Sequence, residues 1–205
     1  MYKSIQRTLA AFLLLLAAGG AGAAETVHVA IDTSSFGASS GYFDMQLSAS
    51  AGVPLATVLL SNVQGFDSSG PVDSWGVTQQ GGDYLFRNDT SNDLFRSAGF
   101  GGVYSFDLTF SGAADPLTAY VSHFVVSAFA ADGMTPLGHY DPVTGALADF
   151  SWTPSVTASG NGSVNVLISD ARVALVPEPS SWALLAAGLT TVGLTLRRRR
   201  PHGDF

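Results

Sequence analysis

Val103-Tyr104-Ser105-Phe106-Asp107-Leu108-Thr109-Phe110 is the stretch that best indicates the fold, because large apolar and polar residues alternate along it without a break. Successive side chains of a β-strand point to opposite faces, so the four large residues from Tyr104 to Phe110 share one face. The three polar residues between them share the other. The pattern predicts a half-buried strand whose apolar face lies against a core.

Similar runs recur on both sides of this stretch, separated by clusters of Gly, Ser, Asn and Asp. The further strands expected from them cover residues 26–31, 42–47, 55–63, 83–87, 119–130 and 163–176. The last run carries Asp170-Ala171, which indicates a bulge, and Asn161-Gly162 just before it is a strong hairpin signal. Short strands with turn-rich connections predict an all-β fold: an antiparallel β-sandwich or jelly-roll-like domain over residues 24–175.

The first 23 residues have the three parts of a secretory signal peptide. Lys3 and Arg7 supply the positive region, residues 9–18 are apolar, and Ala21-Gly22-Ala23 is an A-x-A cleavage site. We therefore expect a signal helix over residues 1–23 and export through the Sec translocon. Signal peptidase is expected to cut next to Ala21 and Ala23.

The last thirty residues combine an extended motif, an apolar segment and a basic stop. Residues 182–196 carry no charge. As a helix they would be ~22 Å long at ~1.5 Å per residue, which is shorter than the ~30 Å hydrocarbon core of a bilayer. The arginines that follow fix this end in the cytoplasm. The segment is expected to be a single short transmembrane helix that anchors the precursor, with Pro177 and Pro179 keeping the motif before it extended.

This tail resembles a PEP-CTERM sorting signal in each of its elements and in their order. The sorting motif is Val176, Pro177, Glu178, Pro179 and Ser180 within residues 176–181, and the cytoplasmic stop is Arg197, Arg198, Arg199 and Arg200. Residues 176–205 are therefore assigned as the sorting tail. Residues 201–205 extend past the point where the family pattern usually ends.

The resemblance implies recognition by an exosortase, a membrane transpeptidase of Gram-negative bacteria. It also implies cleavage near the motif, delivery to the cell envelope or exterior, and an association with exopolysaccharide and biofilm. The domain itself is similar to PEP-CTERM proteins that open with a VHVAIDTS-type strand, here residues 27–34. That family has no assigned activity, so this second likeness implies no mechanism.

The domain is strongly acidic and contains neither lysine nor cysteine. Residues 24–175 hold fourteen acidic side chains against Arg87, Arg96 and Arg172, which gives a net charge of −11. Such a surface repels nucleic acid and anionic lipid, so neither is an expected partner of the domain. The lack of cysteine excludes thiol catalysis, disulfides and cysteine-ligated metals.

No motif of the domain indicates catalysis. His28, His123 and His139 lack metal-ligand spacing, and neither a G-x-S-x-G elbow nor a phosphate-binding loop occurs. We expect no enzymatic activity, no cofactor and no metal site. Residues 88–93 concentrate oxygen atoms of the kind that Ca²⁺ prefers, but they also fit a polar hairpin loop.

Aromatic residues leave a binding function open. Trp75 and Trp152 fall in loop-like stretches near Tyr84, Tyr140 and Phe150. An exposed ring offers a flat apolar face on which a sugar can stack. The tail indicates an exosortase-sorted surface protein, a structural or adhesive component of an exopolysaccharide matrix. The alternative is a carbohydrate-binding module with an aromatic sugar platform, and the burial of the two tryptophans distinguishes a platform from core packing.

Overall fold

The domain is built almost entirely from β-strands. The computed structural model describes residues 24–48, 51–66, 70, 72–117, 120–158, 160, 162–176 and 188–190. The strands within them are β1 Glu25–Asp32, β2 Gly41–Leu47, β3 Ala56–Gln64, β4 Val72–Trp75, β5 Thr78–Gln80, β6 Asp83–Arg87, β7 Asp93–Ala98, β8 Val103–Gly112, β9 Ser122–Ala130, β10 Ala148–Thr153, β11 Ser163–Ile168 and β12 Val173–Val176. Every strand pair in the described chain is antiparallel, which confirms the predicted all-β antiparallel class.

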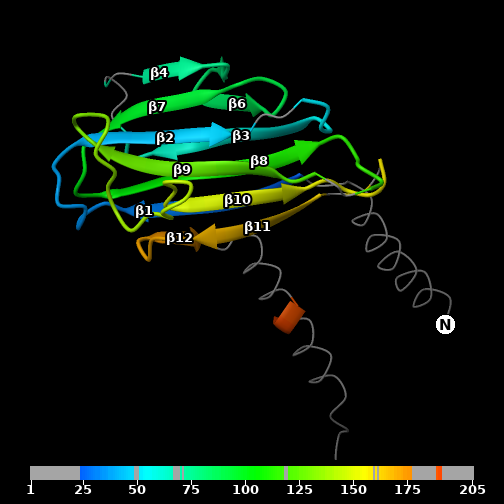
Figure 1. Cartoon of the computed structure of the whole chain (residues 1–205). Helices are drawn as coiled ribbons and strands as arrows, with labels where there is room; N and C mark the ends of the chain where they lie inside the picture. The colour runs from blue at the N-terminus through cyan, green and yellow to red at the C-terminus, as the bar shows by residue number, and fades with distance from the viewer. Residues whose placement is uncertain are drawn as a thin grey trace, which may run out of the picture.

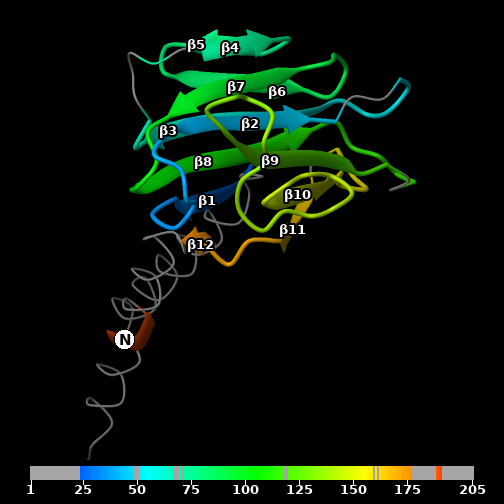
Figure 2. The same ribbon diagram turned by 60° about the vertical axis from the view of Figure 1, so that its left-hand side comes forward.

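The strands form two six-stranded sheets that lie one in front of the other (Figure 1, Figure 2). The first sheet has the order β12-β1-β8-β3-β6-β5, and the second sheet has the order β11-β10-β9-β2-β7-β4. From β1 to β9 the chain changes sheet at every step except between β5 and β6. Consecutive strands are therefore rarely neighbours, and most pairings join distant parts of the sequence.

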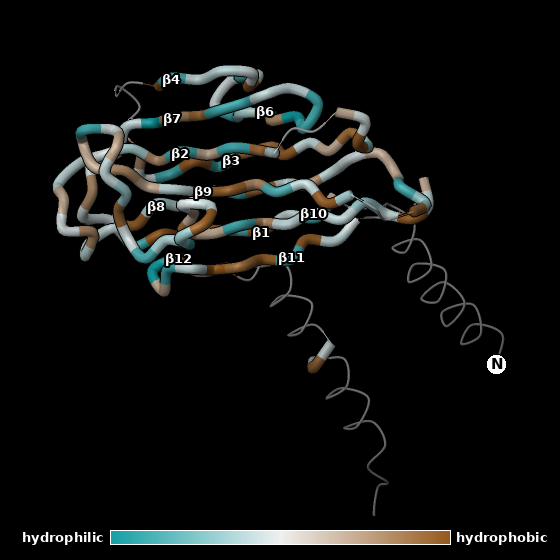
Figure 3. Tube along the Cα trace, viewed as in Figure 1, coloured by the Kyte–Doolittle hydropathy of each residue, from teal (hydrophilic) through white to brown (hydrophobic). Residues whose placement is uncertain are grey.

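The core between the sheets follows from the alternation along residues 103–110. Tyr104, Phe106, Leu108 and Phe110 of β8 are each no more than 2% exposed, as the sequence predicts. Rings meet across the two layers: Phe86 of β6 contacts Phe124 of β9 with ring centroids 5.0 Å apart. Figure 3 shows apolar residues recurring along the strands of both sheets, with hydrophilic residues between them and in the connections.

The run over residues 163–176 is two strands in different sheets, so the predicted bulge at Asp170-Ala171 is wrong. β11 pairs with β10 in the second sheet, and β12 pairs with β1 in the first. The Asp170 carboxylate organises the crossing, because it accepts hydrogen bonds from the backbone of His139 and from the backbone and guanidinium of Arg172. Burial acts to raise the pKa of Asp170, but these hydrogen bonds outweigh it and lower the pKa to about 2.

Candidate functional site

The sorting motif begins at the last residue of the folded domain. Val176 ends β12, is 48% exposed, and lies opposite His28 of β1. The other predicted targeting residues lie outside the described residues: Ala21, Ala23, Pro177, Glu178, Pro179, Ser180, Arg197, Arg198, Arg199 and Arg200. Of the apolar segment 182–196, residues 188–190 are described, and they are helical. Among the described residues, no helix has both the length and the apolar character that a membrane crossing requires.

The asparagine side chains of the polar loop at residues 88–93 form hydrogen bonds that stabilise the fold. Asn88 Oδ1 accepts the Ala56 N–H at 2.8 Å, and Asn92 Oδ1 accepts the Leu47 N–H at 2.7 Å. Ala56 belongs to the first sheet and Leu47 to the second, so the two amides fix the crossing from β6 to β7. Within the described part of the chain, no group of three or more His, Cys, Asp or Glu side chains is placed to hold a metal ion.

A histidine–aspartate pair lies on the outer face of the first sheet. His28 of β1 contacts the Asp107 carboxylate of β8, and Asn62 donates to the same carboxylate at 2.6 Å. Asp107 points away from the core, as its place in the alternation predicts, yet it is only 6% exposed because its two partners cover it. This carboxylate is thus a structural group and not a solvated one.

A second such pair lies on the outer face of the second sheet. His123 Nδ1 of β9 lies 3.0 Å from Asp149 Oδ2 and 3.3 Å from Ser151 Oγ, both on β10. The two partners meet the same ring nitrogen. In a hydrolytic triad the serine and the carboxylate contact opposite nitrogens of the imidazole. The contacts of His123 therefore orient its ring and leave Nε2 as the nitrogen that a ligand can reach.

The two tryptophans have opposite environments. Trp75 on the edge strand β4 is 75% exposed, whereas Trp152 on β10 is 3% exposed. Gly112 and Gly162 leave room for the Trp152 ring, since a Cβ at either position would stand 2.5 Å from ring atoms. Of the two, only Trp75 can serve a platform. Among the neighbouring aromatics, Tyr84 and Phe150 are buried and Tyr140 is 39% exposed.

Further aromatic rings lie on the outer face of the second sheet, beside Trp75. Tyr42 of β2 stacks on Phe95 of β7 with centroids 4.5 Å apart and planes 17° apart, and Phe95 lies 6.1 Å from Phe129 of β9. Trp75 pairs with Asp93 of β7, which places it on the same side of the sheet. We name these four aromatic residues, together with Asp44, Gln46 and Asp93, the outer aromatic face.

Two carboxyl groups share the middle of this face. Asp44 of β2 and Asp93 of β7 lie within hydrogen-bonding distance of each other, and Gln46 Nε2 donates to Asp44 at 3.1 Å. Burial, followed by the contact with Asp93, raises the pKa of Asp44 to about 7. Asp93 Oδ1 is buried and accepts no hydrogen bond from a backbone N–H, an amide or a hydroxyl of the described residues, so the Asp44 carboxyl is the group left to interact with it.

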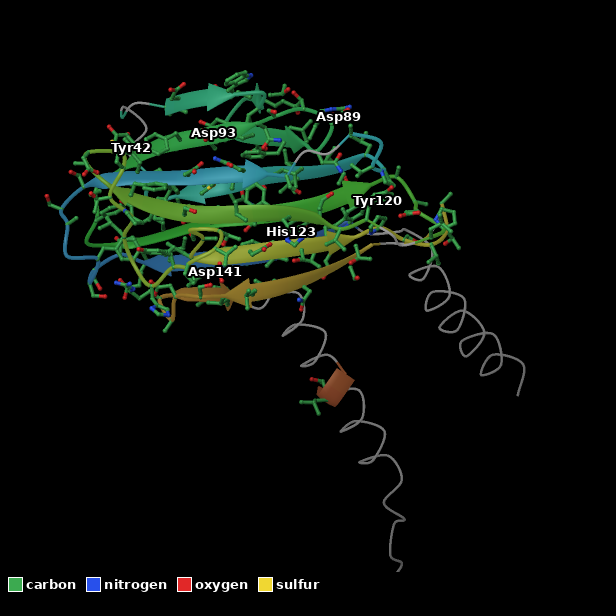
Figure 4. The ribbon with its side chains drawn as sticks, viewed as in Figure 1. Tyr42, Asp89, Asp93, Tyr120, His123 and Asp141 are labelled. Atoms are coloured by element: carbon green, nitrogen blue, oxygen red, sulfur yellow. The ribbon has the colours of Figure 1, made fainter. Side chains whose placement is uncertain are left out.

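Two hollows open at opposite ends of β2. One has a volume of about 310 Å³ and includes Tyr42 and Ser97 in its lining. The other has a volume of about 280 Å³ and includes Gln46, His123 and Val125. Figure 4 shows Tyr42, Asp93 and His123 on the same side of the second sheet, with Tyr42 and His123 toward opposite ends of the strands.

Few features of the sequence indicate this surface. Asp44 and Asp93 are far apart in the chain and meet only because β2 and β7 pair. The one local signal was Tyr42-Phe43-Asp44-Met45-Gln46, in which a tyrosine, a carboxylate and an amide occupy the polar side of a predicted strand. That pattern shows that these side chains share a face but not what lies beside them.

Comparison with known proteins identifies the tail. Residues 175–200 match the family model described as the PEP-CTERM protein-sorting motif. No curated protein and no solved structure matches the chain. The match confirms the resemblance found at the tail and begins with the last two residues of β12. This motif implies export as a membrane-anchored precursor, processing by an exosortase, and a final place at the cell surface. The chain therefore carries a PEP-CTERM protein-sorting motif at residues 175–200.

Proposed function

We propose that the protein enters the Sec translocon, loses residues 1–23 to signal peptidase, and is then cut by an exosortase near Glu178 and delivered to the envelope or exterior. There the domain acts as a structural or adhesive component of an exopolysaccharide matrix or biofilm, with no catalytic activity of its own. The observation that carries the proposal is the sorting motif at residues 175–200.

The position of the motif relative to the domain supports this processing. β12 ends at Val176, so a cut near Glu178 leaves every described strand of the two sheets intact. We also assign the domain to the jelly-roll-like sandwiches, supported by the alternation of successive strands between two facing sheets. A compact fold of this kind without disulfides suits a protein that must persist outside the cell.

The geometry of the carboxyl pair on the outer aromatic face argues against glycoside hydrolysis. Asp44 and Asp93 are in hydrogen-bonding contact. The paired carboxyl groups of glycoside hydrolases stand about 5–9.5 Å apart, which leaves room for the scissile bond or for a water molecule. The Asp44–Asp93 pair has no such room, so it does not fit either geometry.

Intact mass of the protein tests the processing step. The full chain is expressed in a bacterium that has an exosortase and in the same strain without it. The mature protein from the first strain should lack Arg197 to Phe205, and the second strain should retain uncut precursor in its inner membrane. Replacing Pro177, Glu178 and Pro179 together with alanine should reproduce the second result. Recovery of the complete tail on the cell surface would contradict the proposal.

Deletion of the gene tests the role in the matrix. The deletion strain should retain less exopolysaccharide on its cells and form weaker biofilm, and the wild-type gene should restore both. The variant without the sorting motif should fail to restore them, because its domain stays at the inner membrane. Unchanged matrix retention in the deletion strain would rule out a structural or adhesive role.

A carbohydrate-binding module is the second candidate, and one observation favours it. The outer aromatic face combines an exposed tryptophan, a stacked pair of rings and hydrogen-bonding side chains on one side of one sheet. Aromatic faces receive the apolar side of a sugar, while carboxyl and amide groups bind its hydroxyls. Binding of this kind would explain how a surface protein stays within a polysaccharide matrix.

A further inference from the structure

We propose that the outer aromatic face binds a neutral polysaccharide, and that the chain lies across strands β4, β7, β2 and β9 from Trp75 to His123. This inference rests on the carbohydrate-binding candidate above and specifies its ligand class and its surface. Trp75, Asp93, Gln46, Val125 and His123 are named here the binding track.

The strand register places four members of the binding track in a row, and His123 lies two residues from Val125 along β9. Trp75 pairs with Asp93, and Gln46 pairs with Val125. Met45 pairs with Leu94, and continuing this register of β2 and β7 by one residue sets Gln46 beside Asp93. Adjacent strands lie ~4.8 Å apart, so the row from β4 to β9 spans about 14 Å across three strand intervals. That length suits a segment of a polymer rather than a single small molecule.

The two ends of the row differ in a way that suits a sugar chain. At one end Trp75 offers most of its ring to solvent on an edge strand. At the other end Gln46, Val125 and His123 contribute to a hollow of about 280 Å³. A flat ring at the entrance can stack on one sugar, while the hollow receives another and surrounds it with an amide, an imidazole and an apolar side chain.

The middle of the row offers both hydrogen-bond donors and acceptors. Gln46 carries an amide that both donates and accepts, and the carboxyl oxygens of Asp44 and Asp93 add acceptors. His123 adds the ring nitrogen that Asp149 and Ser151 leave free. Sugar hydroxyls both donate and accept, so a surface with mixed groups matches them better than a purely acidic surface does.

The charges on this face favour a neutral polymer over an anionic one. Asp73 pairs with Phe95 on the same side of β4 and β7, so Asp44, Asp73 and Asp93 all lie on this face. Arg96 of β7 points to the opposite side, where its guanidinium lies over the rings of Phe66 and Tyr84. A carboxylated or sulfated polymer would meet negative charge along the track, and a neutral one would not.

Affinity electrophoresis with matched polymers tests the proposal. The full-length protein is purified in mild detergent and run through gels that contain hydroxyethylcellulose, galactomannan or dextran as neutral polymers, and carboxymethylcellulose or alginate as anionic ones. At least one neutral polymer should retard the protein, and neither anionic polymer should. Trp75→Ala and Gln46→Ala should each weaken the binding at least tenfold. Tyr140→Ala, which removes an exposed aromatic from a loop outside the track, should leave it unchanged.

Each result has a definite meaning. Retardation by none of the neutral polymers, or equal retardation by carboxymethylcellulose and hydroxyethylcellulose, overturns the ligand class. Neutral binding that survives both Trp75→Ala and Gln46→Ala overturns the location, provided that the variants melt at the wild-type temperature. The intact-mass experiment tests sorting independently of any glycan, so failure of the binding proposal and failure of the proposed surface function can be told apart.

Discussion

The outer faces of the two sheets differ although both sheets pack on the same core. On the first sheet short hydroxyl side chains satisfy one another across strands: Thr26 with Thr109 at 3.0 Å, and Thr57 with Ser111 at 2.7 Å. On the second sheet the corresponding positions hold the rings and carboxyl groups of the outer aromatic face. Polar groups bond to one another on both faces, but the second face also carries aromatic rings that a partner can contact.

This difference shows that the architecture alone does not locate a binding surface. A two-sheet fold offers two broad outer faces with the same strand geometry. A face can bind a partner when it exposes flat apolar area and has hydrogen-bonding groups that its own side chains do not fully occupy. The comparison therefore separates residues whose loss should unfold the protein from residues whose loss should only stop binding.

The largest effect on stability is expected from the loss of a buried ring of β8. Phe106→Ala should lower the free energy of unfolding by about 3–5 kcal/mol, because a fully buried phenylalanine leaves a cavity. Thr109→Ala, on the outer side of the same strand, is the matched control and should cost less than about 1.5 kcal/mol. Urea unfolding followed by fluorescence measures both. Equal losses would mean that the core and the outer face of the first sheet contribute alike.

The second-largest loss of stability is expected in the polar network on the outer face of the first sheet. Asp107→Ala should cost about 1–3 kcal/mol, because it leaves His28 and Asn62 without their acceptor. Asp107→Asn should recover part of the loss, since its amide oxygen still accepts from Asn62. Thermal unfolding at neutral pH compares the two variants. A loss below the measurement error in Asp107→Ala would show that this face is solvated and not internally bonded.

The carboxyl pair of the second face should make stability depend on pH. The pKa of Asp44 rises from 3.8 to about 7 on folding, so the folded protein keeps a proton that the unfolded chain has released in this window. Its contribution to stability therefore falls as the pH rises from about 4 to 7. Asp44→Asn keeps a neutral donor toward Asp93 and should stabilise the protein at pH 8 by on the order of 1–3 kcal/mol.

Melting temperatures measured from pH 5 to pH 8 check this prediction. The decline with pH in the wild type should be reduced in Asp44→Asn. Asp73→Asn, which removes one charge from the same face but lies on β4, should keep the wild-type slope. A variant curve parallel to the wild-type curve would show that Asp44 does not hold the proton.

The smallest effect on stability is expected at Trp75. Its ring is 75% exposed on an edge strand, so Trp75→Ala should change the free energy of unfolding by less than about 0.5 kcal/mol. Calorimetry of the variant and the wild type provides the measurement. A loss of several kcal/mol would place the ring among the packing residues and would weaken the contrast between the two outer faces.

Sequence patterns identified the strands whose outer side is plainly polar. β8 is the clearest case, because small polar residues separate its four buried apolar ones. The run over residues 119–130 is apolar on both faces, which predicts a central strand, and β9 does lie inside the second sheet, between β10 and β2. These strands can be predicted because burial of one or both faces places apolar residues at regular positions in the sequence.

The strands β4, β5, β7 and β10 are missing from those expected, for identifiable reasons. β7 places Leu94 in the core and Phe95 on the outer face, so two apolar neighbours interrupt the period of two. β4 and β5 are short and exposed on both sides, so their residues show no alternation of buried apolar and polar positions. In β10 the alternation of Ala148, Phe150 and Trp152 is present, but its first residue is small. The candidate site therefore lies partly on strands that the pattern did not predict, namely β4 with Trp75 and β7 with Asp93 and Phe95.

The pairing of β12 with β1 has a consequence for the order of events during export. A chain that crosses a membrane with its N-terminus first delivers β1 early, whereas β12 arrives after the rest of the domain. Until then β1 is an open sheet edge, because its outer neighbour in the first sheet is β12. The motif residues follow Val176 without a spacer. Completion of the first sheet and emergence of the sorting motif thus coincide, so a chain that presents the motif already contains everything needed to fold.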